Sequence, residues 1–226
     1  MIKAVIFDMF ETLITLFVGR IYFSEDIATD LGLPVEDFRR EWHKTENFRS
    51  TGKYSIEEAL AVTLKNMSAY SEEKVLLVAK KRRESLADTF SAMPQASLQL
   101  LQALHEKGIK IGLITNTFSD ECEMIKASKL FPFFDSAMIS YEQGILKPDP
   151  AIYKASMSAL NVKPEECLYV GDGGSRELFA AREIGMKALQ CTWFHDLAFE
   201  PHIPCPLLED FPHVNHQLEV LNYLDS

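Results

Sequence analysis

The residues of this chain with the clearest capacity for chemistry are Asp8 and Thr12, which follow a short apolar run near the N-terminus. Residues 4–7 are all apolar and predict a buried strand, so Asp8 stands where that strand ends. Open α/β sheets carry their chemistry at the carboxyl ends of their strands. A carboxylate there must be paired, hydrogen-bonded or metal-bound, because burying a bare charge is costly. We therefore take both residues as catalytic candidates, although an isolated Asp8 could equally be an ordinary surface residue.

Further functional side chains stand at two other predicted strand ends and in a loop between them. Thr115 and Asn116 close one apolar run, and Asp172 follows another on a glycine-rich turn. Lys147 lies between these runs, in a loop that contains two prolines. Because the carboxyl ends of parallel strands face one crevice, we expect these side chains to gather near Asp8.

This set of groups is suited to holding a phosphoryl group together with a divalent cation. Asp8 and Asp172 offer the hard oxygen ligands that magnesium prefers. Thr115 and Lys147 offer donors to phosphoryl oxygens, and the helix after the glycine-rich turn points its positive end at the site. Each signal is weak alone, since Thr-Asn pairs often cap helices and most lysines are exposed. Their shared place at strand ends favours a functional interpretation.

Two patterns along the sequence indicate which elements position these residues. Residues 16–87 have helical periodicity throughout, with helix starts at Ser24, Pro34, Ser55 and Ser71, and the second of these helices is expected to continue through Phe48. From residue 93 onward, strands alternate with helices. The predicted strands are 109–114, 136–139, 167–170 and 187–191, and the predicted helices are 98–106, 120–130, 150–160 and 177–184.

Alternation of this kind predicts βαβ units and a parallel sheet. The expected fold class is therefore α/β, with a doubly wound parallel sheet as the core and an α-helical cap domain inserted after the first strand. We assign residues 1–15 and 88–226 to the core and residues 16–87 to the cap. The C-terminal segment, with several prolines and histidines, predicts an extended path over the surface.

Composition limits the possible partners. The 226 residues are 47% hydrophobic and 25% charged, as in globular proteins. A formal net charge of −10 argues against nonspecific binding to nucleic acid or to anionic membranes, so we expect a small-molecule substrate. The sequence leaves monomer and homodimer equally open.

Cysteine usage and the N-terminal residues indicate a compartment. The four cysteines form no CxxC pair, which argues against a zinc site and predicts reduced thiols in a cytoplasmic protein. Asp8 and Glu11 interrupt the apolar N-terminus and no small-residue cleavage site follows, so we expect no signal peptide. No run approaches the ~20 apolar residues of a membrane span.

The chain resembles the haloacid dehalogenase (HAD) superfamily, in the subgroup with a helical cap inserted after the first motif. The resemblance covers nearly the whole chain and is carried by Phe7-Asp8-Met9-Phe10-Glu11-Thr12-Leu13, Ile114-Thr115-Asn116, Lys147-Pro148 and Val170-Gly171-Asp172-Gly173-Gly174-Ser175. It implies a Rossmann-like core and a mobile cap that closes over the site. It also implies that Asp8 is a nucleophile, and that Mg²⁺ binds Asp8, the main-chain carbonyl of Phe10 and Asp172.

Position 10 departs from the phosphatase pattern of this family. The phosphatases carry a second aspartate two residues after the nucleophile, whereas this chain has Phe10. A general acid usually worth ~10²–10⁴ in rate is therefore missing. The dehalogenases carry an aromatic residue there, because a halide leaves without a proton. Asp172, with Glu177 five residues later, favours the opposite conclusion, because it preserves a magnesium-binding pattern that the dehalogenases do not need.

Phe10, Glu11 and Arg49 are the candidate substrate contacts. Glu11 replaces the small glycine usual in the family, and it either supplies the missing acid or is merely solvated or salt-bridged. The second alternative is favoured, since neighbouring residues on an extended segment point apart. Arg49 precedes Thr51-Gly52, a loop that could swing over the crevice, whereas Arg39 and Arg40 are more typical of a solvated helix face.

Three functions follow from these residues. The favoured one is a magnesium-dependent phosphatase that acts on a small phosphorylated metabolite through an aspartyl-phosphate. The second is a metal-independent 2-haloacid dehalogenase, with Asp8 attacking carbon while Lys147, Thr115 and Arg49 orient the carboxylate. The third is a catalytically weakened binding or regulatory protein of the same fold.

Overall fold

A computed structural model of the protein describes residues 1–225. Its centre is a six-stranded sheet in the order β3-β2-β1-β4-β5-β6, and each pair of neighbouring strands is parallel. The predicted α/β fold with a doubly wound parallel sheet is confirmed. The strands are β1 (Ala4–Phe7), β2 (Lys110–Thr115), β3 (Ser136–Ile139), β4 (Cys167–Gly171), β5 (Lys187–Cys191) and β6 (His213–Val214).

The register of the sheet places Asp8 at the middle of its carboxyl edge. Strand β1 pairs with β2 on one side and β4 on the other, so that Phe7 lies opposite both Leu113 and Val170. The backbone N–H of Asp8 donates to the Val170 carbonyl at 3.0 Å. The loops that follow these three strands therefore leave the sheet together, at the edge where the candidate residues lie.

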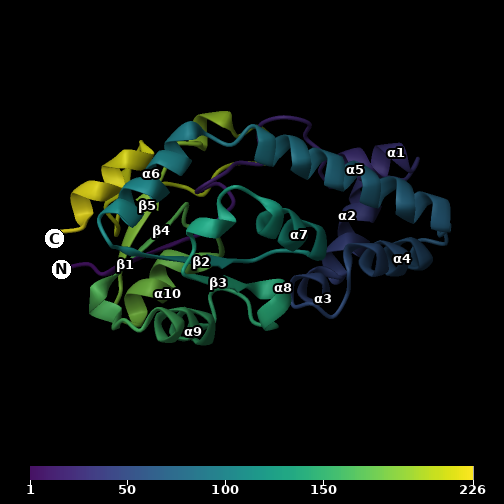
Figure 1. Cartoon of the computed structure of the whole chain (residues 1–226). Helices are drawn as coiled ribbons and strands as arrows, with labels where there is room; N and C mark the ends of the chain where they lie inside the picture. The colour runs from purple at the N-terminus through teal and green to yellow at the C-terminus, as the bar shows by residue number, and fades with distance from the viewer. Residues whose placement is uncertain (226) are drawn as a thin grey trace.

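Helices cover both faces of the sheet, because side chains of each strand alternate between two apolar layers. Val5 and Phe7 enter the layer beneath α6 and α7, whereas Ala4 and Ile6 enter the layer beneath α9 and α10. The two sets of helices lie on opposite sides of the sheet (Figure 1). Their bounds, with those of the short α8, are α6 (Gln95–Glu106), α7 (Ser119–Ala127), α8 (Ser140–Gln143), α9 (Pro150–Leu160) and α10 (Glu177–Glu183).

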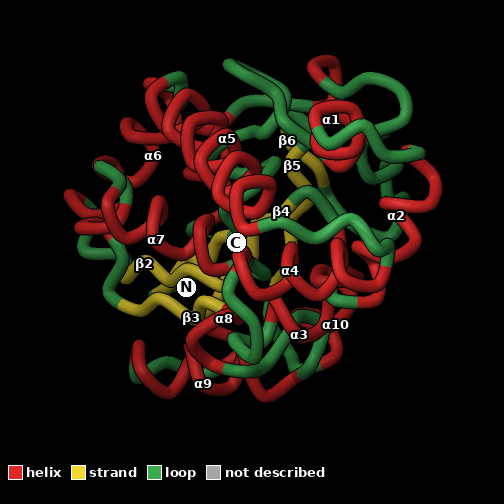
Figure 2. The backbone as a smooth tube through the Cα atoms, turned by 90° about the vertical axis from the view of Figure 1, so that its right-hand side faces the viewer, coloured by secondary structure: helices red, strands yellow, loops and turns green. Residues whose placement is uncertain are grey.

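The cap is built from five helices that follow β1: α1 (Ser24–Asp30), α2 (Val35–Lys44), α3 (Glu46–Ser50), α4 (Ile56–Asn66) and α5 (Glu72–Ser91). Ser55 and Glu58 form a reciprocal capping box at the start of α4. The apolar faces of the helices meet in a core of their own, with Phe38 and Leu60 fully buried. The cap lies at one end of the molecule and both termini at the other (Figure 1), and the cap end faces the viewer in Figure 2.

One helix of the cap differs from the sequence-based expectation. The helix expected to continue through Phe48 is divided into α2 and α3, because the Thr45 hydroxyl donates to the Trp42 carbonyl at 2.8 Å and competes with the helical bond. Helix α5 extends across the proposed domain boundary after residue 87, and that boundary stays a prediction. No helix within residues 1–225 is both long and apolar enough to span a membrane.

The C-terminal segment is more regular than expected. Instead of an extended surface path alone, it contains β6, which pairs with β5 at the edge of the sheet, and a 3₁₀ helix over Gln217–Tyr223. Val220 and Leu224 from this end of the chain enter the apolar layer next to α6. The C-terminal end of the chain is therefore part of the same apolar layer as α6 and α7.

Candidate active site

An ion pair between Asp8 and Lys147 forms the centre of the site. Asp8 is 8% exposed and Lys147 is 5% exposed. The Nζ atom of Lys147 lies 2.6 Å from Oδ1 of Asp8. The fold thus brings together two candidate residues that are far apart in the sequence.

Lys147 is shared with a second carboxylate, that of Glu177 at the start of α10. Lys147 Nζ lies 2.6 Å from Glu177 Oε2, and the Glu177 side chain is fully buried. The same carboxylate accepts a hydrogen bond from the Tyr169 hydroxyl at 2.8 Å and one from the Gly173 N–H at 3.2 Å. These two donors hold the Glu177 carboxylate in place against the Lys147 ammonium group.

The charges of this cluster keep Lys147 cationic. Burial alone would lower the pKa of Lys147, but the carboxylates of Asp8 and Glu177 raise it above its ordinary value. Burial raises the pKa of Glu177 in turn. The ammonium group is therefore a fixed positive charge beside Asp8.

The sequence analysis named Glu177 only as part of a magnesium pattern and did not name Tyr169. Both residues belong to the support of Lys147 rather than to the exposed crevice, since Tyr169 and Glu177 are each 0% exposed. The sequence feature that could have identified Tyr169 was a hydroxyl-bearing side chain inside an otherwise apolar strand. A buried tyrosine usually needs a hydrogen-bond partner, and here Glu177 is that partner.

Asn116 positions the loop that carries Lys147. Its side chain accepts from the Lys147 N–H at 2.9 Å and donates to the Lys147 carbonyl at 3.2 Å. The peptide bond that follows, between Lys147 and Pro148, is cis. Asn116, at the end of β2, thus fixes the position of the Lys147 backbone through two hydrogen bonds.

Asp172 lies on the turn between β4 and α10. Its Oδ1 accepts from the Gly174 N–H at 2.9 Å, and its carbonyl accepts from Gln190 Nε2 at 2.9 Å. Gly173 has φ of +102°, a conformation that side-chain-bearing residues rarely adopt. Burial and the neighbouring charge of Asp8 raise the pKa of Asp172 to about 6.

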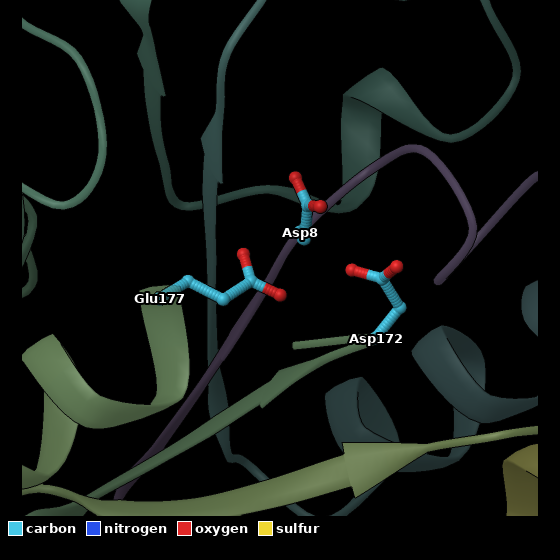
Figure 3. Close-up of side chains that lie close together, drawn as sticks. All are labelled: Asp8, Asp172 and Glu177. Atoms are coloured by element: carbon cyan, nitrogen blue, oxygen red, sulfur yellow. The ribbon is translucent and has the colours of Figure 1, made fainter. Parts of the chain in front are cut away.

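The carboxylates of Asp8, Asp172 and Glu177 form one cluster, as Figure 3 shows. One oxygen from each lies within 4.8 Å of the others. Three acidic groups this close repel one another, and Lys147 neutralises only part of their charge. The donor set is made of hard oxygen atoms, so the site fits a divalent cation of the magnesium type.

The two candidate threonines have different surroundings. The hydroxyl of Thr115, at the end of β2, is buried and has no hydrogen-bond partner among the described residues. Thr12 is buried in the turn after Asp8, where its hydroxyl accepts from the Cys191 thiol and its carbonyl accepts from the Trp193 indole at 2.9 Å. Thr12 therefore ties the Asp8 loop to the end of β5, whereas Thr115 keeps a free donor.

Comparison with known proteins identifies the family of this chain. A family model described as haloacid dehalogenase-like hydrolase matches residues 2–185. The chain belongs to the haloacid dehalogenase-like hydrolases. The resemblance predicted from the sequence motifs is thus confirmed.

One curated HAD-like relative is the glyceraldehyde 3-phosphate phosphatase of Pyrococcus furiosus. It is 38% identical over 103 residues, which make up 45% of this chain and 41% of that protein. Matches to the first curated relatives span about two fifths of the relatives' own length. The matches therefore leave more than half of each of those relatives uncovered.

Two solved HAD-like structures share the fold. The 2-haloacid dehalogenase of Pseudomonas syringae pv. Tomato DC3000 has a TM-score of 0.70 and 22% identity, and the match covers 100% of this chain and 99% of that one. A HAD family enzyme of Bacteroides thetaiotaomicron, an aspartate-to-alanine mutant in complex with magnesium and inorganic phosphate, has a TM-score of 0.64 and 20% identity over 85% of this chain and 95% of that one. At sequence identities this low, the structural similarity shows a common fold only.

The two residues after Met9 have different surroundings in this HAD-like chain. The Phe10 side chain is half-buried and packs against the apolar layer beneath α6. Glu11 has φ of +56°, and its carboxylate accepts from the Thr15 hydroxyl at 2.5 Å and from the Leu16 N–H at 2.9 Å. Burial raises the pKa of Glu11 to about 7 against the effect of these hydrogen bonds. Glu11 is thus bonded within its own turn, an arrangement that neither sequence-based alternative had described.

Arg49 lies inside the cap rather than on a surface loop. Its guanidinium group is stacked between the Trp42 and Phe118 rings, at 4.1 and 4.5 Å from their centroids. It donates to the Trp42 carbonyl and the Thr45 hydroxyl. Phe118 follows β2, so this stack joins the cap to the core. A role for Arg49 in substrate binding stays a prediction.

Proposed function

We propose that this chain is a magnesium-dependent phosphatase that acts on a small phosphorylated metabolite. The observation that carries the proposal is the contact of Asp8 with Lys147 beside the acidic cluster at the carboxyl edge of the sheet. A nucleophile, a fixed cation and oxygen ligands are the groups that phosphoryl transfer through an acyl-phosphate needs. The name of the Pyrococcus relative supports the same class of reaction.

Asp8, Asp172 and the main-chain carbonyl of Phe10 are the groups we expect to hold the metal ion. The raised pKa of Asp172 supports this assignment, because its charge is poorly compensated within the protein. Bound magnesium would neutralise charge between the carboxylates and the phosphoryl oxygens. Glu177 is already engaged by Lys147 and Tyr169, and we assign it to positioning the lysine.

Each protein group has a separate task in this reaction. A carboxylate oxygen of Asp8 attacks phosphorus, the ester bond breaks, and its electron pair leaves on the departing oxygen. Lys147 and the unpartnered Thr115 hydroxyl donate to the phosphoryl oxygens. Water then hydrolyses the acyl-phosphate, which releases phosphate and restores Asp8. Phe10 cannot protonate the departing oxygen, so the rate should depend on how stable that anion is.

Phe10 also favours a second candidate, a 2-haloacid dehalogenase in which Asp8 attacks carbon. A halide ion leaves without a proton, so an aromatic residue at position 10 costs that reaction nothing. In this candidate Lys147, Thr115 and Arg49 would orient the substrate carboxylate. The cluster of three carboxylates argues against it, because a metal-free site gains nothing from crowded acids.

A panel of phosphate esters and 2-haloacids, assayed with Mg²⁺ and with chelator, tests these candidates. We expect phosphate release that depends on Mg²⁺, and we expect Asp8→Asn to reduce it to a few per cent or less while the protein stays folded. Turnover of 2-chloropropionate in the presence of chelator would instead establish the dehalogenase. Magnesium binding without turnover of either class would indicate the weakened binding protein.

A further inference from the structure

A cavity between the cap and the core has walls unusually rich in aromatic side chains. It has a volume of about 210 Å³, and five of its twelve lining residues are aromatic. These are Tyr22, Phe23, Trp42, Phe118 and His202. Leu16, Ile27 and Leu86 add apolar surface. Walls of this kind bind flat apolar groups by burial and by ring-to-ring contacts.

The cavity is connected through the chain to the catalytic edge of the sheet. Leu16 belongs to the loop that leaves Asp8, and its N–H is bonded to Glu11 in that loop. Phe118 belongs to the loop that carries Asn116. The same two loops thus carry catalytic groups and cavity walls, as expected for a pocket that holds the part of a substrate next to its phosphoryl group.

The walls offer no uncompensated cation. Arg82 lines the cavity, but its guanidinium group lies 2.7 Å from Asp120 and 3.2 Å from Glu121. Burial lowers the pKa of His202, which favours its neutral form. A second anionic group on a substrate would therefore meet the carboxylate of Glu121 and no unpaired cation among the residues that line the cavity.

Size and leaving-group chemistry point to the same class of ligand. A cavity of about 150 Å³ can hold benzene, so a volume of about 210 Å³ accommodates one substituted ring. Since Phe10 cannot donate a proton, the departing oxygen must leave as an anion. A phenol loses its proton at pH of about 10, much more readily than an alkyl alcohol, so a phenolate leaves without such help.

We propose that the substrate is an aryl phosphate monoester, whose uncharged ring occupies this cavity while its phosphoryl group faces Asp8 and Lys147. This inference rests on the proposed phosphatase function and names its substrate class. The bond from Asp8 to phosphorus forms as the bond from phosphorus to the phenolic oxygen breaks. The phenolate carries the electron pair away and takes its proton from water.

A matched pair of esters separates ring recognition from leaving-group acidity. Phenyl phosphate and hexafluoroisopropyl phosphate release alcohols of similar acidity, but only the first is aromatic. We expect kcat/KM with Mg²⁺ to be ~10-fold or more higher for phenyl phosphate, the gain from burying much of a ring. Acetyl phosphate, which is small and needs no proton donor, reports on the phosphatase reaction itself.

Substitutions in the cap test the location of the ring site. Phe23→Ala should lower kcat/KM for phenyl phosphate by several-fold more than for acetyl phosphate. Phe48→Ala is the matched control, because Phe48 is 39% exposed on the cap and does not line the cavity. The control should leave the ratio of the two rates unchanged, and thermal unfolding checks that both variants fold.

The outcomes distinguish the two proposals. Equal kcat/KM for the matched esters, with acetyl phosphate turned over, overturns the aryl inference and leaves the phosphatase function intact. An unchanged ratio in Phe23→Ala also overturns it, because the ring then binds elsewhere. Failure to hydrolyse acetyl phosphate under any metal condition overturns both.

Discussion

Lys147 lies between two carboxylates, and this shared contact determines how single residues of the site respond to substitution. Its ammonium group is 2.6 Å from both Asp8 and Glu177. Glu177 is fully buried, so it depends on Lys147 for charge compensation. The lysine therefore has a structural task as well as the catalytic one that we propose.

Lys147→Met should abolish turnover and destabilise the protein by ~3–5 kcal/mol, because it leaves the buried charge of Glu177 without a counterion. Glu177→Gln combined with Lys147→Met should recover a large part of that stability, since both charges are then removed. The double variant should stay inactive. Denaturant unfolding and phosphate-release assays on both variants measure the two effects. Equal destabilisation of the single and double variants would contradict a charge-based explanation.

Phe10→Asp should increase the rate on alkyl phosphates by ~10-fold or more, because it supplies a proton donor for poor leaving groups. Aryl and acyl phosphates should gain less, since their leaving groups need little assistance. Phe10→Asn is the control, because asparagine has nearly the same shape and polarity as aspartate but cannot act as an acid. If the rate of the wild-type protein does not depend on leaving-group acidity while chemistry is rate-limiting, another residue supplies the proton. Glu11 is then the first candidate, and Glu11→Gln tests it.

At the scale of elements, the turn from β4 to α10 presents Asp172 and also supports Glu177. Gly173 adopts a positive φ there, and its N–H donates to Glu177. Gly174 donates to Asp172 in the same turn. A single tight turn thus orients one acidic group toward the expected metal ion and another toward the lysine.

Asp172→Ala should weaken magnesium binding by ~10-fold or more, because it removes an expected ligand. Without metal, the variant should be at least as stable as wild type at pH 7. The raised pKa of Asp172, about 6, means that its charge destabilises the metal-free fold. Calorimetric titration with Mg²⁺ and unfolding in chelator give the two quantities. Asp210→Ala, at an exposed position, serves as the control, and unchanged affinity in Asp172→Ala would exclude this metal site.

At the scale of the whole molecule, stability should depend on pH through acids that folding buries near the site. Glu11 has an ordinary pKa of 4.5 and a pKa of about 7 in the folded protein. Between these values the folded chain retains a proton that the unfolded chain has lost. The free energy of unfolding must then fall as pH rises through this window. The effect is complete above pH of about 7.

Glu11→Gln should reduce this loss of stability between pH 5 and pH 7 by about 1–2 kcal/mol. This is less than the full shift of the Glu11 pKa implies, because the side chain is partly solvated. Glutamine keeps an acceptor for the Leu16 N–H but cannot ionise. Denaturant unfolding in chelator at both pH values measures the slope. The exposed Glu73→Gln on α5 is the control. Identical slopes in Glu11→Gln and wild type would show that Glu11 does not titrate in this window.

Much of the fold could be predicted from local patterns. The apolar run before Asp8, the alternation of strands and helices, and the cap signals at Ser55 and Ser71 all depend on neighbours in the sequence. They identified β1, the parallel core and the helical insertion. The short pairing of β6 escaped prediction because two residues carry no readable alternation.

The sequence by itself determined the family, the fold class and which strand ends carry chemical groups. Only the tertiary structure decided that Lys147 is shared between Asp8 and Glu177, that Arg49 is stacked between Trp42 and Phe118, and that aromatic side chains from cap and core line one cavity. Periodicity and spacing report only the conformation of nearby residues. Contacts between distant segments depend instead on how helices pack on the sheet and on the cap, which no local pattern encodes.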